Sequence, residues 1–154
     1  MAEWKTPVFD RTMEDVKSLD RASAVYQKGA LNTEDLNRIE NNYCYLEELL
    51  KADAIFLPRN FRSYIEMGIL YTDWQEHNLP WLSEINRIRA NYNALVRLFL
   101  VGLGLPILPE NNYLDYTEVN HWERFALLGK EMFGKMEKEY IPCGTMDSGG
   151  DRLL

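Results

Sequence analysis

Residues 34–40 read Glu-Asp-Leu-Asn-Arg-Ile-Glu, and the last six positions of this stretch recur twice later in the chain. Residues 84–89 read Glu-Ile-Asn-Arg-Ile-Arg, and residues 118–123 read Glu-Val-Asn-His-Trp-Glu. Each copy contains an acid, an aliphatic residue, Asn, a basic residue or His, a large apolar residue and a charged residue. An acid favours a helix N-terminus, and apolar residues three positions apart begin a buried stripe. The pattern therefore predicts three helix starts.

The asparagine is the unusual position of the repeat, because Asn is a mediocre helix former. Its side chain can both donate and accept a hydrogen bond. We therefore expect Asn37, Asn86 and Asn120 to bond a preceding loop carbonyl or to cap a neighbouring segment, the alternative being coincidence in an Asn-rich chain. The gaps between the three are unequal, 49 and 34 residues, whereas a solenoid needs a fixed period. This predicts one compact bundle with internal pseudo-repeats.

Hydrophobic periodicity predicts about four helices. The first covers residues 12–28, with Thr12 as N-cap and Asp15 completing a capping box. The second follows the N-cap Asn32 and carries its apolar residues on one face. Arg38 and Asn42 are expected on its opposite, exposed face, and Glu47-Glu48 as a solvated acidic pair. The third and fourth cover residues 80–100 and 117–139, and Asp115 is the candidate cap of the fourth. Residues 52–79 are less readable, and within them residues 64–71 fit either a short helix or a strand, between which periodicity does not decide.

These elements define a mainly α fold in one domain, which suits a chain of 154 residues. Residues 1–11 contain Trp4 and Phe9 and are expected to form an extended docking arm, since large aromatic side chains are costly to leave in water. Residues 12–141 are expected to form the single helical domain. Residues 142–154 are rich in glycine and are expected to be a flexible tail.

Charge and composition exclude several classes of partner. The net charge of −7 disfavours nucleic acid as a partner. The candidate basic patch consists only of Arg87, Arg89 and Arg97, and we expect these residues to form a solvated helix face. No apolar run is long enough to span a membrane. Residues 1–10 lack the apolar segment of a signal peptide, so the protein is expected to be made and kept in the cytoplasm until it joins an assembly.

No catalytic constellation is visible, and we predict that the protein is not an enzyme and has no catalytic, cofactor or metal site. The two histidines, His77 and His121, lack the spacing of a metal site. The two cysteines, Cys44 and Cys143, make neither a disulfide framework nor a zinc site. Aromatic residues near the ends of elements and the tail cysteine are instead the candidate partner-binding residues: Trp4, Phe9, Trp74, Trp81 and Cys143.

The chain also resembles a known group of proteins. The likeness is carried by Trp4, Thr6-Pro7, Asp10-Arg11-Thr12 and Asp15-Val16, by residues 29–42 (Gly-Ala-Leu-Asn-Thr-Glu-Asp-Leu-Asn-Arg-Ile-Glu-Asn-Asn), and by Thr72-Asp73-Trp74, Leu79-Pro80, Ile85-Asn86-Arg87-Ile88, Leu105-Pro106, Pro109 and residues 114–120. With these motifs it resembles small, tail-associated minor structural proteins from the virions of tailed phages and prophages of Gram-positive bacteria. The C-terminus departs from the group, since Pro142-Cys143-Gly144-Thr145 and the residues after it stand where a Tyr-Ser-Gly-Glu type of ending is common.

The resemblance implies a virion structural or assembly protein, made in the host cytoplasm, that acts as a tail, neck or baseplate adaptor. It would contact other virion proteins and form a homo-oligomer within the particle, without nucleic acid, membrane or cofactor. Two alternatives stay open: a phage-encoded accessory enzyme active on the cell wall, and a regulatory protein that binds a host factor.

Overall fold

The computed structural model describes residues 1–52, 61–78, 80–98 and 103–139. Within these ranges the chain forms five α-helices and no strand, in a compact bundle, so the predicted mainly α class is confirmed. Three helices are long, namely α2 (Thr33–Ala52), α4 (Leu82–Leu98) and α5 (Tyr116–Glu139). Two are short, namely α1 (Met13–Lys17) and α3 (Phe61–Tyr64).

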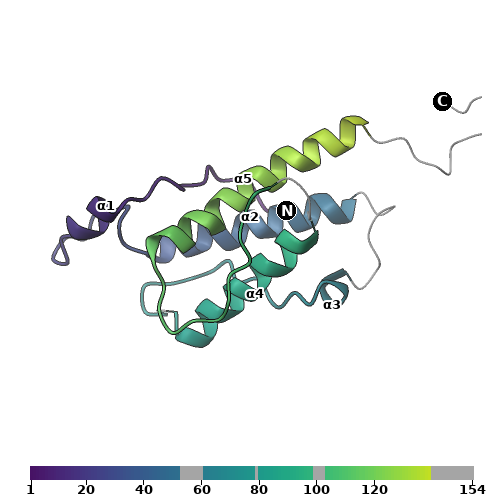
Figure 1. The fold of residues 1–154 in the computed structure, drawn as a ribbon. Helices are drawn as coiled ribbons and strands as arrows, with labels where there is room; N and C mark the ends of the chain where they lie inside the picture. The colour runs from purple at the N-terminus through teal and green to yellow at the C-terminus, as the bar shows by residue number, and fades with distance from the viewer. Residues whose placement is uncertain (53–60, 79, 99–102, 140–154) are drawn as a thin grey trace, which may run out of the picture.

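The three long helices begin at the same end of the bundle and run in the same general direction (Figure 1). Ion pairs join these beginnings: Arg38 of α2 pairs with Glu123 of α5 at 2.5 Å, Arg87 of α4 pairs with Glu40 at 2.8 Å, and Arg89 pairs with Glu118. The connecting segments must therefore return along the bundle, which explains why long stretches of the chain are not helical.

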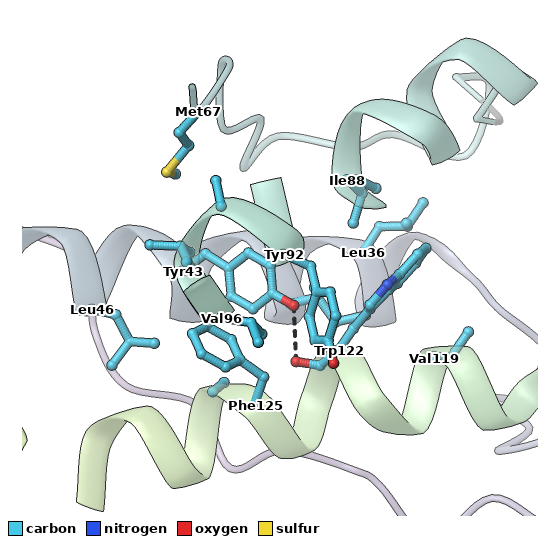
Figure 2. Close-up of a cluster of buried hydrophobic side chains, with 14 of the residues drawn as sticks. Leu36, Tyr43, Leu46, Met67, Ile88, Tyr92, Val96, Val119, Trp122 and Phe125 are labelled. Carbon is cyan, nitrogen blue, oxygen red and sulfur yellow. Dashed lines mark hydrogen bonds between the residues drawn. The ribbon is translucent and has the colours of Figure 1, made fainter. Parts of the chain in front are cut away.

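The core lies between the apolar stripes of α2, α4 and α5 (Figure 2). At its centre Phe125 meets Tyr43 and Tyr92 edge to face, with ring centroids 5.6 and 5.7 Å apart. The Tyr43 hydroxyl donates to the carbonyl oxygen of Trp122 at 3.0 Å, so this buried polar atom is satisfied. Burial of each such side chain contributes about 2–3 kcal/mol. The largest fully buried apolar residues in the described part of the chain are Leu36, Ile39, Tyr43, Leu46, Ile88, Tyr92, Leu95, Trp122 and Phe125.

Helices α2 and α5 begin close to where the sequence predicts, and α4 begins at Leu82, two residues after the expected Pro80. The Asn32 side chain accepts from the backbone N–H of Asp35 at 3.0 Å, ahead of α2. The Asp115 carboxylate accepts from the backbone N–H of Glu118 at 2.9 Å, ahead of α5. These caps satisfy amides that have no partner within the helix.

The predicted helix over residues 12–28 is wrong beyond its first turn. The capping box of Thr12 and Asp15 is present, but α1 ends at Lys17 and buries none of its residues. After it, Asp20 and Gln27 join across a turn by two hydrogen bonds of 2.7 Å between backbone and amide groups. A helix without a buried face has little to stabilise it, and these local bonds compete with helical ones.

Gly29 closes this turn against the backbone of α1. A Cβ atom placed on Gly29 would lie 2.1 Å from the carbonyl oxygen of Asp15. The N-terminal arm then lies along α2 and α5 (Figure 1). Residues 64–71, which periodicity left undecided, are neither helix nor strand beyond Tyr64, the last residue of α3. Residues 53–60 and 79 lie outside the described residues, as does the predicted tail over residues 142–154.

Candidate interaction surface

Asparagine side chains hold the non-helical segments onto the long helices. Asn37 of α2 accepts from the backbone N–H of Trp74 at 2.7 Å and donates to its carbonyl at 3.0 Å. Asn120 of α5 binds the backbone of Arg11 in the same way, at 3.1 and 2.9 Å. An extended segment against a helix finds no free backbone partner there, because the helix uses its own amides internally. The Asn amide replaces that partner.

Three further asparagines act alike and were not singled out by the repeat. Asn42 binds both backbone groups of Lys5, at 2.9 and 2.7 Å. Asn93 binds those of Leu108, at 2.8 and 2.7 Å. Asn91 accepts from the N–H of Gly68 at 2.7 Å and donates to the carbonyl of Ile69 at 2.8 Å. Two of them could have been found from the sequence, because Asn42-Tyr43 and Asn91-Tyr92 stand at the same distance after Asn37 and Asn86.

Asn86 differs from the other repeated asparagines. Its oxygen accepts from the Arg89 guanidinium at 2.7 Å and from the backbone N–H of Asn111 at 3.5 Å. Arg89 itself donates to the carbonyl oxygens of Asn111 and Tyr113. Here an arginine oriented by the asparagine holds the segment before α5. Arg89 is buried, so the expectation of a solvated face at residues 87–97 is wrong at this position.

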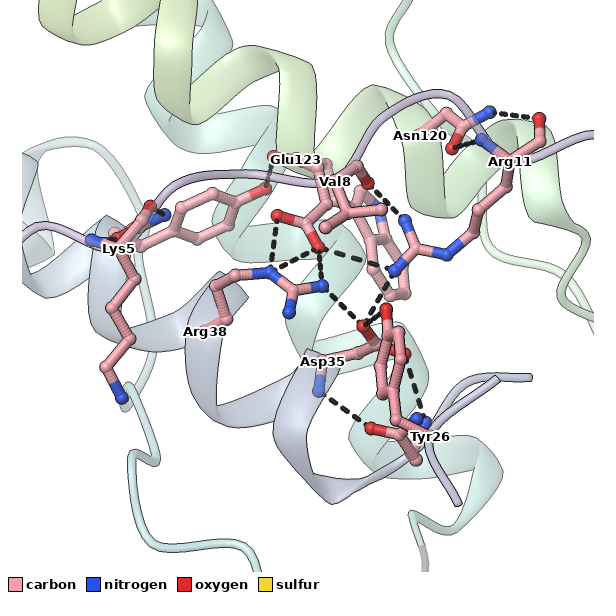
Figure 3. Close-up of polar contacts among 12 residues, drawn as sticks. Lys5, Val8, Arg11, Tyr26, Asp35, Arg38, Asn120 and Glu123 are labelled. Carbon is pink, nitrogen blue, oxygen red and sulfur yellow. Dashed lines mark hydrogen bonds and ion pairs between the residues drawn. The ribbon is translucent and has the colours of Figure 1, made fainter. Parts of the chain in front are cut away.

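The charged residues of the repeat form a buried cluster with Arg11 of the arm (Figure 3). Arg11 pairs with Asp35 at 2.8 Å, and Arg38 pairs with Asp35 and with Glu123. Two guanidinium groups thus face two carboxylates, and the four charges cancel. A buried charge is tolerated when it is paired and hydrogen-bonded. The cluster therefore fixes the arm across α2 and α5.

Burial shifts the pKa values of two side chains at this cluster, Glu123 and Tyr26. Burial raises the pKa of Glu123 above its ordinary value, although the hydrogen bond and charge of Arg38 oppose the rise. Burial, followed by the negative charge of Asp35, raises the pKa of Tyr26, whose hydroxyl donates to Asp35 at 3.0 Å. Most of the hydrogen bonds of these five side chains join them to one another, and Arg11 also donates to the carbonyl oxygen of Val8 in the arm. This arrangement holds the arm, α2 and α5 together.

A second ion pair supports the surface next to it. Glu40 is buried and receives two hydrogen bonds of 2.8 Å from Arg87. The same carboxylate accepts from the indole N–H of Trp74 at 3.1 Å and from the backbone N–H of Tyr71 at 2.5 Å. Arg87 also donates to the carbonyl of Ile69 at 2.7 Å. Residues 69–74 are therefore fixed by α2 and α4 together.

Two residues of this fixed segment, Tyr71 and Trp74, line a groove of about 780 Å³, and we call them its floor. The Trp74 side chain is 6% exposed and meets the Tyr71 ring edge to face, with centroids 5.1 Å apart. Trp81, directly before α4, is 77% exposed and also lines the groove. We call this the aromatic groove; its apolar lining residues are Tyr71, Trp74, Pro80 and Trp81.

Polar side chains line the remainder of the aromatic groove, namely Glu76, His77, Asn78 and Glu84. Glu84 pairs with Arg87 at 2.8 Å. Trp and Tyr are enriched where proteins contact one another, because they combine a large apolar area with a polar tip. An aromatic groove with an acidic rim and one largely exposed indole has the composition of a contact surface.

The structure brings together two of the five predicted partner-binding residues, Trp74 and Trp81. Trp4 instead packs within its own chain: its ring lies 5.5 Å from that of Tyr45, and the Lys130 ammonium lies 4.3 Å from its centroid. Phe9 is 38% exposed on the arm. Cys143 lies outside the described residues.

Several buried polar residues were misjudged from the sequence. Arg38 and Asn42 were assigned to the exposed face of the second helix, and Glu47 to a solvated acidic pair, but all three are buried. Glu47 is held by Arg62 at 2.6 Å and Lys51 at 3.0 Å. Cys44 is half-buried, and burial raises its pKa to about 11.

Within the described ranges, no helix is long and apolar enough to cross a membrane. The same residues contain no group of three or more His, Cys, Asp or Glu side chains placed to hold a metal ion. Comparison with models of protein families, with curated proteins and with solved structures gave no match.

Proposed function

We propose that this chain is a structural subunit of a phage virion, an adaptor of the tail, neck or baseplate that acts by protein–protein contacts and not by catalysis. The resemblance to minor virion proteins motivates the particle. The aromatic groove supports the mode of action, because it offers Trp81 to a partner on a floor that Asn37, Glu40 and Arg87 hold in place.

The buried charges support the same proposal. The cluster of Arg11, Asp35, Arg38 and Glu123 joins the arm to two helices through ion pairs between buried side chains. Such a network costs desolvation and specifies one arrangement of segments. A pre-organised scaffold lowers the cost of binding, which suits a subunit that must fit a fixed neighbour in an ordered particle.

Mass spectrometry of purified, washed particles tests this proposal. A structural subunit should be present at a fixed stoichiometry relative to the other virion proteins. Absence from washed particles would refute it and would favour the accessory enzyme or the regulatory protein. A pull-down would then identify a host partner.

Substitution of Trp81 tests the contribution of the groove. Because Trp81 is 77% exposed, Trp81→Ala should leave the melting temperature unchanged while reducing incorporation into particles. Tyr113→Ala is the matched control, since Tyr113 is 62% exposed and does not line the groove. Equal incorporation of the two variants would exclude the groove as the contact.

A further inference from the structure

We propose that the aromatic groove binds an extended, cationic segment of a neighbouring protein, with an Arg or Lys side chain stacked on the Trp81 indole and paired with Glu76 and Glu84. This inference rests on the proposed function, because it treats the groove as an assembly contact. It adds the chemistry of the partner.

The groove carries unbalanced negative charge. Glu76 has no ion-pair partner within the described part of the chain. Glu84 pairs with Arg87, but that guanidinium also makes two bonds to the buried Glu40. Glu40 and Glu84 therefore share one guanidinium, Glu76 has none, and none of the described lining residues is Lys or Arg. A cation entering the groove would compensate this charge.

The exposed indole provides the second half of the recognition. A cation within about 6 Å of a Trp ring centroid is attracted by the electron density of its face. The protein uses this contact internally, since Lys130 lies 4.3 Å from the Trp4 centroid and 5.6 Å from that of Tyr45. Trp81 presents the same kind of ring, 77% exposed, beside two carboxylates.

The groove also suits an extended backbone. Asn78 lines it, and its side chain has no hydrogen-bond partner among the described residues. Elsewhere in this molecule Asn37, Asn42 and Asn120 each bind both backbone groups of an extended residue. Asn78 offers the same amide to a segment that enters the groove from outside.

Charge separates this partner from the other candidates. Nucleic acid would bring phosphates against the Glu76 and Glu84 carboxylates. A second copy of this chain carries the same net charge of −7 and would be repelled at the acidic rim. A basic segment from a different protein is attracted by both the rim and the net charge, and steering of this kind accelerates association.

Fluorescence anisotropy on the full-length protein tests the inference. The probes are three fluorescein-labelled peptides that alternate glycine with arginine, lysine or glutamate. The arginine peptide should bind more tightly than the lysine peptide, because guanidinium stacks better on an indole, and the glutamate peptide should not bind. Binding of the glutamate peptide, or of a DNA oligonucleotide, as tightly as the arginine peptide would overturn the inference.

Variants distinguish the groove from general attraction by an acidic protein. Trp81→Ala should raise the Kd of the arginine peptide by about two- to fivefold, and Glu76→Gln by up to about fivefold. Tyr113→Ala and Glu131→Gln remove an exposed aromatic ring and an exposed charge outside the groove and should change the Kd little. Equal effects of the groove variants and their controls would overturn the inference.

Failure of this inference can be told apart from failure of the proposed function. If the protein is present in particles at a fixed stoichiometry but the groove variants bind the arginine peptide like their controls, the cationic partner is wrong and the structural role stands. If the groove binds the peptide as described but washed particles lack the protein, the virion role is wrong and the cationic site stands.

Discussion

Replacement of Asn37 by alanine tests whether asparagine side chains that bind the backbone of non-helical segments stabilise the fold. The Asn37 amide makes two hydrogen bonds to the backbone of Trp74, at 2.7 and 3.0 Å. The Trp74 side chain is buried, so water replaces these bonds poorly. The substitution therefore removes both bonds and leaves a partly buried N–H and carbonyl without partners.

The expected magnitude follows from two opposing terms. Each lost hydrogen bond costs about 1 kcal/mol net, and more where the remaining group is buried. Alanine is a better helix former than asparagine by about 0.5 kcal/mol, which offsets part of the loss. We expect a net destabilisation of about 1.5–2 kcal/mol, which corresponds to a melting temperature about 3–8 °C lower for a chain of this size.

Asn41→Ala is the matched control in the same helix. Asn41 makes one exposed hydrogen bond, to the carbonyl of Glu3, so its loss should be nearly balanced by the gain in helix propensity. Urea denaturation followed by far-UV circular dichroism measures both variants. Equal stability of Asn37→Ala and Asn41→Ala would refute the idea that asparagine side chains bound to backbone groups stabilise the fold.

Three further substitutions test other parts of the structure. Gly29→Ala should lower the free energy of unfolding by about 1–3 kcal/mol, because its Cβ would lie 2.1 Å from the backbone of α1. Gly134→Ala should raise that free energy by about 0.5–1 kcal/mol, because its Cβ meets nothing within 4 Å and alanine is the better helix former. Thermal denaturation measures both, and the opposite order of stability would contradict the packing. Burial alone would raise the pKa of Glu47, but bonds from Arg62 and a neighbouring lysine outweigh it and hold the pKa below 4.5. The charged Glu47 therefore stabilises the fold above that pH, and its contribution decreases as pH falls through the lowered pKa. Glu47→Gln should be less stable than the unmodified protein at neutral pH and approach its stability in acid, and Glu131→Gln is the control for net charge. A stability difference between Glu47→Gln and the unmodified protein that did not change with pH would show that the Glu47–Arg62 pair does not act through its charge.

Helix-start chemistry was the part of the fold that could be read locally. The caps Asn32 and Asp115, and the buried stripe that begins at Leu36, follow from short-range bonding and from the 3.6-residue period. Both depend on residues within a few positions of each other. The same local reasoning predicted a helix beyond Lys17 that does not form. A helix also needs a surface against which to bury one face, and distant parts of the chain supply that surface.

The candidate site was predictable in composition but not in geometry. Trp74 and Trp81 were both singled out as aromatic residues near the ends of elements, yet one is the buried floor and the other the exposed rim of the same groove. Their difference arises because Glu40, on another helix, binds the indole N–H of Trp74. No sequence pattern near Trp74 encodes that partner, 34 positions away.

Local signals in the chain were enough to predict that it is helical, about where its long helices begin and that one asparagine recurs at the same place in each. These features depend on local propensity, on spacing and on side-chain chemistry. What the repeated polar residues do depends on contacts that form only in the folded chain. Asn37 and Asn120 bind extended segments 37 and 109 positions away, and Arg38 is buried because Glu123 lies opposite it. Polar side chains are exposed by default, and a paired partner brought close by the fold is what makes their burial tolerable.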